Sequence, residues 1–220
     1  MNNKRFIFVS DFDGTLTAKD FYQMIIDDYI GEVGQELYKA WRRKEYKDKD
    51  FLAQIYRSIG RDEDEILEDI LKIEWDEHAS EVIQKIKDSG GEFAILSAGT
   101  SYYIDRLLEA KKISDLKVYS NPGYYQDRGI HLKPDESSPY YSDVYGIDKA
   151  KVVKAFKEQY EKVYFAGDSA PDIEPAKLAD LVFAKGTLQE MLREQDIPFI
   201  PINHFGEVED ELIRRGVLRA

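Results

Sequence analysis

A short apolar strand that ends in two carboxylates is the feature that most restricts how this chain can fold. The run FIFVSDFDGTL fills residues 6–16, and residues 6–9 indicate a strand buried on both faces. Asp11 and Asp13 follow directly, and Gly14 lets the backbone turn sharply after them. Open parallel sheets bind ligands beyond the carboxyl ends of their strands. The run therefore predicts an α/β protein that carries two acids at its functional edge.

A second strand followed by acids lies near the C-terminus. Residues 162–166 indicate a strand, and GDSAPD follows at residues 167–172. Asp168 stands at the strand end, whereas Asp172 falls in the first turn of a helix that Pro171 can begin. Converging carboxylates in a chain without cysteine form a hard, oxygen-rich set that suits Mg²⁺. Asp172 has a second interpretation, because a negative charge at a helix N-terminus interacts favourably with the helix dipole.

A third strand, residues 93–96, ends in Ser97, and residues 102–110 predict a helix just after it. A hydroxyl and free backbone amides at a helix N-terminus can bind an anion. The alternative is that Ser97 or Thr100 only caps the helix.

A lysine opens a later helix. Apolar residues follow Lys149 at three, four and seven positions, so Lys149 is expected on the side that meets the core. Lys151, two positions on, does not share that side. A lysine at this end of a helix can bind phosphate as a point charge, although most lysines are only solvated surface.

In this order, the four motifs resemble those of the haloacid dehalogenase superfamily over residues 5–200. The resemblance implies a Rossmann-like parallel-sheet core with catalytic acids at the end of its first strand. Asp11 would be the nucleophile that forms an aspartyl-phosphate, and Asp13 would be the general acid and base. Such a nucleophile needs its charge offset before a phosphate dianion approaches, which Mg²⁺ provides.

The resemblance also assigns the remaining site residues. Asp11, Asp168 and the backbone carbonyl of Asp13 would hold Mg²⁺, with Asp172 supporting them from outside. The phosphoryl oxygens would be bound by three further residues, namely Ser97, Ala98 and Lys149.

The second acid separates the branches of the superfamily. Dehalogenases of the family lack an acid two residues after the nucleophile, so Asp13 favours a phosphatase. Phosphotransferases and mutases share all four motifs and remain open as alternatives. A non-catalytic binding protein on this fold is the alternative of another class, and the intact motif positions disfavour it.

Between the first two motifs, residues 18–75 show helical periodicity without a convincing strand. Gly31, Gly34 and Gly60 are expected to divide this stretch into a small bundle. The insertion resembles the all-helical C1 cap of the family, which predicts a cap at 18–75 and an α/β core at 1–17 and 76–220.

Asp20 lies where the chain enters this predicted cap. It is a good N-cap for a helix over residues 21–30. In the phosphoserine phosphatase branch, a carboxylate at the matching place receives the substrate's ammonium group, so Asp20 is also a candidate for substrate specificity.

Residues 121–146 are rich in tyrosine, proline and glycine. Residues 124–126 and 130–132 predict a β-hairpin extension, and the remainder predicts a long loop that packs or binds substrate. This pattern narrows the resemblance to a branch that includes methylthiopentenyl-phosphate phosphatases of methionine salvage and phosphoethanolamine/phosphocholine phosphatases. The neighbouring branch, phosphoserine phosphatase, shares the helical cap. Relatives often carry several cysteines in this loop, and here there are none.

Charge and composition limit the partners. A net charge of −12 disfavours nucleic acid, whose affinity comes from neutralised phosphates. No apolar run is long enough to cross a membrane, and the residues before the first strand are too few for a signal peptide. We therefore expect a cytoplasmic enzyme, a monomer or a homodimer, that acts on a small-molecule phosphate ester.

Overall fold

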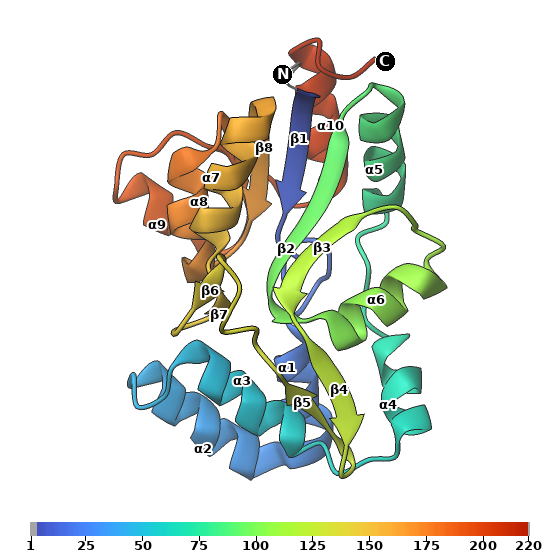
Figure 1. Cartoon of the computed structure of the whole chain (residues 1–220), viewed down its shortest axis with the longest axis vertical. Coiled ribbons are helices and arrows are strands. Elements are labelled where there is room, and N and C mark those ends of the chain that lie inside the picture. Colours follow the sequence, from blue (N-terminus) through green and yellow to red (C-terminus); the bar gives the residue numbers. More distant parts are fainter. Residues whose placement is uncertain (1–3, 220) are drawn as a thin grey trace.

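A six-stranded parallel sheet forms the centre of the molecule (Figure 1). The computed structural model describes residues 4–219. The strand order is β10-β9-β8-β1-β2-β3, and every pairing along it is parallel. The strands span Lys4–Ser10 (β1), Glu92–Thr100 (β2), Lys117–Asn121 (β3), Tyr160–Gly167 (β8), Leu181–Ala184 (β9) and Ile200–Pro201 (β10). The predicted α/β class is therefore confirmed.

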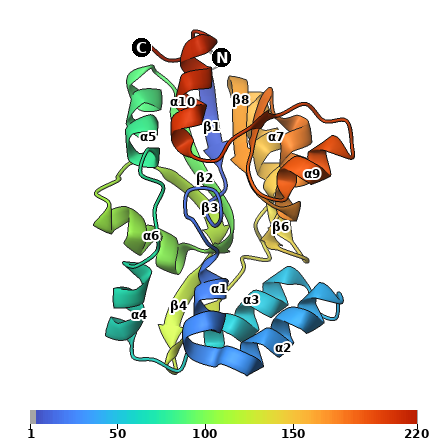
Figure 2. The same ribbon diagram turned by 180° about the vertical axis from the view of Figure 1, so that it is seen from behind.

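Helices cover both faces of this sheet, which explains the continuous apolar run in β1. Phe6 and Phe8 belong to one buried cluster, with α5 (Ala79–Asp88) and α10 (Phe205–Arg214). Ile7 and Val9 point the other way and belong to a second cluster. That cluster includes side chains of α7 (Lys149–Gln159), α8 (Ile173–Leu178) and α9 (Leu188–Arg193). Figures 1 and 2 show the two groups of helices on opposite sides of the sheet.

A helical insertion separates β1 from α5. It contains α1 (Phe21–Ile25), a π-helical turn η1 (Ile26–Ile30), α2 (Gly31–Arg42), α3 (Asp48–Arg57) and α4 (Glu63–Ile70). Thr17 and Trp75 form an antiparallel bridge where the chain leaves the sheet and returns to it. These helices lie in the stretch for which the sequence predicts a cap.

Two of the three glycines in this insertion stand at helix junctions, as expected. Gly31 follows η1 with φ 44°, and Gly60 lies between α3 and α4 with φ 71°. The expectation for Gly34 is wrong, because it lies buried inside α2. A Cβ there would come within 2.8 Å of Ile26 and Ile30 side chains, so Gly34 allows α2 to pack closely on η1.

The predicted hairpin is formed by β4 (Gly123–Gln126) and β5 (Gly129–Leu132). Asp127 and Arg128 both have positive φ, as a two-residue type I′ turn requires. The hairpin contacts the helical insertion, because the Arg61 amide donates to the Arg128 carbonyl at 3.0 Å and Arg128 Nε donates to the Gly60 carbonyl at 3.0 Å.

A second contact joins the start of α3 to the short pair β6 (Tyr141–Ser142) and β7 (Gly146–Ile147). Lys49 Nζ donates to the Tyr141 hydroxyl at 2.7 Å and to Asp143 Oδ1 at 3.1 Å. The segment that follows β3 therefore contacts the insertion at two places. Across residues 4–219, no helix combines the length and the apolar character that crossing a membrane would need.

Candidate active site

Three neighbouring strands bring the predicted site residues together. β1 lies between β2 and β8, and all three run in the same direction. Asp11 follows β1, Ser97 lies near the end of β2, and Asp168 follows β8. The Asp11 amide still donates to the Ala166 carbonyl at 2.9 Å, so β8 fixes the backbone at Asp11.

Three carboxylates form a cluster at this edge. Asp11, Asp168 and Asp172 each offer an oxygen, and these oxygens lie within 4.8 Å of one another. The Thr15 hydroxyl donates to Asp168 Oδ1 at 3.2 Å. Gly14 has φ 74°, and a Cβ there would lie 2.5 Å from Asp168 Oδ2, so only glycine leaves room for this carboxylate.

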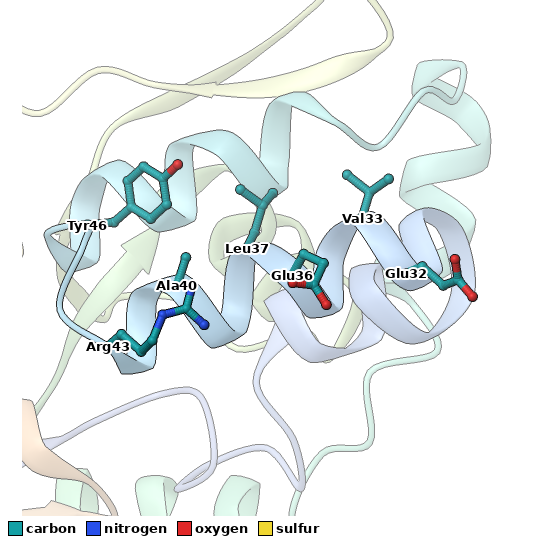
Figure 3. Close-up of a pocket in the computed structure, with 7 residues that line it drawn as sticks. All are labelled: Glu32, Val33, Glu36, Leu37, Ala40, Arg43 and Tyr46. Atoms are coloured by element: carbon teal, nitrogen blue, oxygen red, sulfur yellow. The ribbon is translucent and has the colours of Figure 1, made fainter.

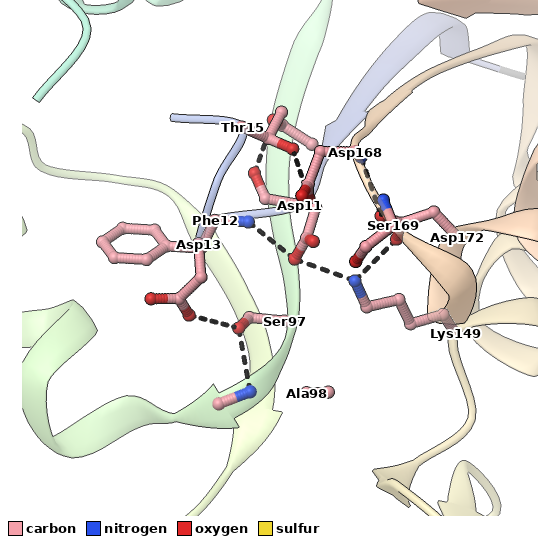
Figure 4. A network of polar contacts seen from close by, with 12 residues as sticks. Asp11, Phe12, Asp13, Thr15, Ser97, Ala98, Lys149, Asp168, Ser169 and Asp172 are labelled. Atoms are coloured by element: carbon pink, nitrogen blue, oxygen red, sulfur yellow. Dashed lines mark hydrogen bonds and ion pairs between the residues drawn. The ribbon is translucent and has the colours of Figure 1, made fainter. Parts of the chain in front are cut away.

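Lys149 is the cation in this cluster, and only 4% of it is exposed. Its Nζ lies 2.8 Å from Asp11 Oδ1 and 2.7 Å from Asp172 Oδ1 (Figure 4). Asp148 caps α7 by accepting from the Lys151 amide at 3.0 Å, which sets where the helix begins. Lys151 itself is exposed, so the predicted helix register is confirmed.

Asp172 is fully buried and both of its oxygens are used. Oδ1 contacts Lys149, and Oδ2 accepts from the amides of Asp168 at 3.0 Å and Ser169 at 3.3 Å. Asp172 therefore holds the loop after β8 and the lysine in place. The placement of Asp172 outside the metal ligands stays a prediction.

Burial makes the negative charge of this cluster costly. It raises the pKa of Asp11 well above its ordinary value, and the charge of Asp172 adds to this. Burial and Asp172 likewise raise the pKa of Asp168 to about 7. Burial lowers the pKa of Lys149, but Asp11 and Asp172 outweigh it and leave that pKa above its usual value. One lysine does not neutralise three carboxylates, and the oxygen donors fit a hard divalent cation.

Asp13 points away from Asp11, as alternation along an extended chain predicts (Figure 4). Its Oδ2 accepts hydrogen bonds from the Tyr103 hydroxyl and from the Ser97 hydroxyl, the latter at 3.5 Å. Its Oδ1 accepts from the Phe21 amide at 3.1 Å. Burial raises the pKa of Asp13, and the hydrogen bond from Tyr103 opposes this rise.

Tyr103 is a site residue that the sequence analysis missed. It lies in α6 (Ser101–Ala110), which begins directly after β2. A helix that begins at a strand end places its first turn at the site, and this is the signal that could have indicated Tyr103.

The serine motif serves two purposes. The Thr100 hydroxyl accepts from the Tyr102 amide at 3.3 Å, so Thr100 caps α6. Ser97 does not cap the helix; its hydroxyl accepts from the Gly99 amide at 3.0 Å and faces Asp13. The Ala98 carbonyl accepts from Asn121 Nδ2 at 2.8 Å. Phosphate binding by Ser97 and Ala98 stays a prediction.

Asp20 stands at the N-cap position of α1, but its side chain caps no backbone amide. Instead, Asp20 Oδ2 accepts from Gln23 Nε2 at 3.1 Å, and the first amide of α1 is bound by Asp13. The expectation that the Asp20 side chain caps α1 is therefore wrong. Burial raises the pKa of Asp20 to about 7, and the charges of Asp13 and Asp168 add to this, so Asp20 lies within electrostatic reach of the site.

A hollow on α2 lies away from these residues (Figure 3). Two of its charged side chains are paired locally: Glu36 with Lys39 at 2.8 Å, and Arg43 with Glu45 at 2.6 Å. Val33 is the large apolar residue exposed there.

The parallel sheet therefore gathers buried carboxylates, a buried lysine and a hydroxyl at its carboxyl edge, an arrangement typical of an α/β enzyme whose site is built on acids. Residues 8–177 match the haloacid dehalogenase-like hydrolases, and the chain belongs to this family. The predicted family and enzyme class are therefore confirmed.

Similar proteins agree with this assignment. The chain is 25% identical over 205 residues to a 2-hydroxy-3-keto-5-methylthiopentenyl-1-phosphate phosphatase of Bacillus cereus (strain B4264), covering 92% of this chain and 93% of that protein. The fold is similar to that of a substrate-bound phosphoserine phosphatase (TM-score 0.68, 17% identity, 96% and 99% of the two chains). It is also similar to a phospho-aspartyl intermediate analogue of phosphoserine phosphatase (TM-score 0.69, 19% identity, 94% and 99%).

Proposed function

We propose that the protein is a Mg²⁺-dependent phosphatase that hydrolyses a small phosphorylated metabolite through an aspartyl-phosphate on Asp11. The observation that carries this is the geometry of the two acids. The carboxylate of Asp11 faces Lys149 and the other acids of the cluster, whereas that of Asp13 faces Ser97 and Tyr103. A nucleophile and a proton donor on opposite sides suit the in-line displacement of a leaving oxygen.

In the first half of the reaction, an Asp11 oxygen attacks phosphorus and the bond to the ester oxygen breaks. Asp13 gives its proton to the leaving oxygen. In the second half, Asp13 takes a proton from water, which attacks the same phosphorus. The bond between phosphorus and Asp11 breaks, and inorganic phosphate and the free carboxylate result.

The other residues neutralise and hold the phosphoryl group. Lys149 offers its charge to the phosphoryl oxygens, and Ser97 and Ala98 offer a hydroxyl and an amide. Asp11, Asp168 and the backbone carbonyl of Asp13 would hold Mg²⁺. When bound, this ion offsets the negative charge that nucleophile and phosphate bring together.

The helical insertion, residues 18–75, acts in this proposal as a cap on the core formed by 1–17 and 76–220, excluding water and selecting substrates. Asp20 favours a phosphoserine phosphatase-like alternative within the same chemistry. The loss of solvent and the charges of Asp13 and Asp168 make ionised Asp20 costly, Lys149 offsets this only in part, and an ammonium group on the substrate would offset it further.

The test is turnover of an aryl phosphate and of a panel of small phosphorylated metabolites with Mg²⁺. We expect phosphate release by the wild type, with a loss of about 10³-fold or more in kcat for Asp11→Asn. Absence of turnover across the panel, or full turnover by Asp11→Asn, would refute the proposal. Phosphoryl transfer to an added alcohol rather than to water would identify a phosphotransferase instead.

A further inference from the structure

The carboxyl group of Asp13 is held from two sides by groups outside the family motifs. Tyr103 is fully buried, and its hydroxyl donates to Asp13 Oδ2. The amide of Phe21 donates to the other oxygen at 3.1 Å. A free aspartate rotates broadly about its terminal torsion. Two donors on different oxygens restrict that rotation, so they set where an Asp13 proton can go.

Gly99 makes the contact between Tyr103 and Asp13 possible. A Cβ at this position would overlap the Tyr103 hydroxyl oxygen and lie 3.0 Å from Asp13 Oδ2. The glycine is therefore required by close approach. Without a side chain at this position, the Tyr103 hydroxyl has the space to reach the Asp13 carboxylate.

The ring of Tyr103 is fixed by aromatic neighbours from both parts of the molecule. Phe12 lies next to it from the β1 loop, with ring centroids 5.9 Å apart. Phe21 of α1 and Tyr56 of α3 belong to the helical insertion, and their ring centroids lie 4.6 and 6.2 Å from that of Tyr103. The insertion therefore takes part in two of the three hydrogen bonds described for Asp13. It supplies the Phe21 amide itself, and it supplies the two rings that hold Tyr103.

We propose that Tyr103 is a positioning residue that holds the Asp13 carboxyl in the orientation needed for proton transfer to the leaving oxygen. Gly99 provides the space for its hydroxyl, and Phe21 and Tyr56 fix its ring. This inference rests on the proposed function, in which Asp13 gives its proton to the ester oxygen as the phosphorus–oxygen bond breaks.

The experiment compares the dependence of kcat/KM on the leaving group in wild type and Tyr103→Phe. A series of phosphate monoesters runs from p-nitrophenyl phosphate to simple alkyl phosphates. Proton donation matters most for alkyl leaving groups, so we expect about a tenfold loss for them and less than about a twofold loss for p-nitrophenyl phosphate. The plot of log kcat/KM against leaving-group pKa then becomes steeper, which general damage to the site would not cause.

Two further variants control the result. Tyr102→Phe removes the adjacent hydroxyl, which donates to Glu63 at 2.7 Å instead, and should leave the slope unchanged. Gly99→Ala should steepen the slope as Tyr103→Phe does, and the double variant should add no further steepening. Thermal unfolding of each variant establishes that it is folded.

An equal loss on all esters, or no loss, in a folded Tyr103→Phe variant would overturn the role of Tyr103 and leave the proposed function standing. If the wild type hydrolyses none of the esters, the proposed function fails and the role of Tyr103 fails with it.

Discussion

Replacing Lys149 by methionine tests the electrostatics of the site in depth. The substitution keeps a long side chain but removes the cation that contacts Asp11 at 2.8 Å and Asp172 at 2.7 Å. Breaking a buried ion pair from one side costs about 3–5 kcal/mol, because the remaining charge loses its partner. We expect a decrease of that size in the free energy of unfolding near neutral pH, measured by urea denaturation without divalent cations.

The pH dependence of this loss follows from the raised carboxylate pKa values. Folding raises the pKa of Asp168 from an ordinary 3.8 to about 7, and that of Asp11 also rises. Such groups contribute stability that is present below the unfolded pKa and lost as the pH rises through the folded pKa. Without Lys149 these values rise further, so the deficit should be small near about pH 4 and largest above about pH 7.

Lys151→Met is the matched control. Lys151 is exposed, and among residues 4–219 its ammonium group contacts the Tyr141 carbonyl at 3.0 Å and Asp148 at 3.7 Å, so its loss should change stability by less than about 0.5 kcal/mol. Equal stability of the two variants, or a Lys149→Met deficit that does not grow with pH, would refute this account of the cluster.

Three further outcomes are expected. Chelation of divalent cations should abolish phosphate release and Mg²⁺ should restore it; restoration by Zn²⁺ and not by Mg²⁺ would contradict the hard-oxygen argument. Asp20→Ser should lower kcat/KM on amino-bearing phosphates and leave it unchanged on amino-free phosphates. An equal effect on both classes would show that Asp20 takes no part in substrate recognition. Because folding raises the pKa of Asp20 to about 7, its ionisation opposes folding between an ordinary 3.8 and that value. Asp20→Asn should therefore gain stability relative to the wild type as pH rises through this window, and a pH-independent difference in urea denaturation would contradict it.

The sheet and the meeting of the four motifs could be predicted from the sequence because parallel strands end at one edge. The apolar run in β1 indicates burial on both faces, and Phe8 and Val9 indeed belong to clusters on opposite faces. Helical spacing alone predicted the side of α7 on which Lys149 lies. The structure confirms it, because Lys149 is buried and Lys151 is exposed.

Other features depend on tertiary contacts that local patterns indicate only in part. The Tyr103 contact requires α6 to begin immediately after β2 and Gly99 to leave space for the hydroxyl. Gly34 resembles a helix breaker in sequence, but its role is set by the side chains of η1 packed against it. The Asp20 side chain does not cap α1, because its carboxylate accepts from the side chain of Gln23 instead.

Trapping the covalent intermediate tests the central claim most directly. Enzyme quenched during turnover of a phosphate ester is reduced with borohydride, which converts an aspartyl-phosphate to homoserine, and is then mapped by peptide mass spectrometry. The account predicts homoserine at position 11. With p-nitrophenyl phosphate, whose leaving group needs little proton donation, Asp13→Asn should increase its amount, because weaker activation of water slows hydrolysis of the intermediate. An adduct on another residue, or an unmodified Asp11 in enzyme that is turning over, would contradict it.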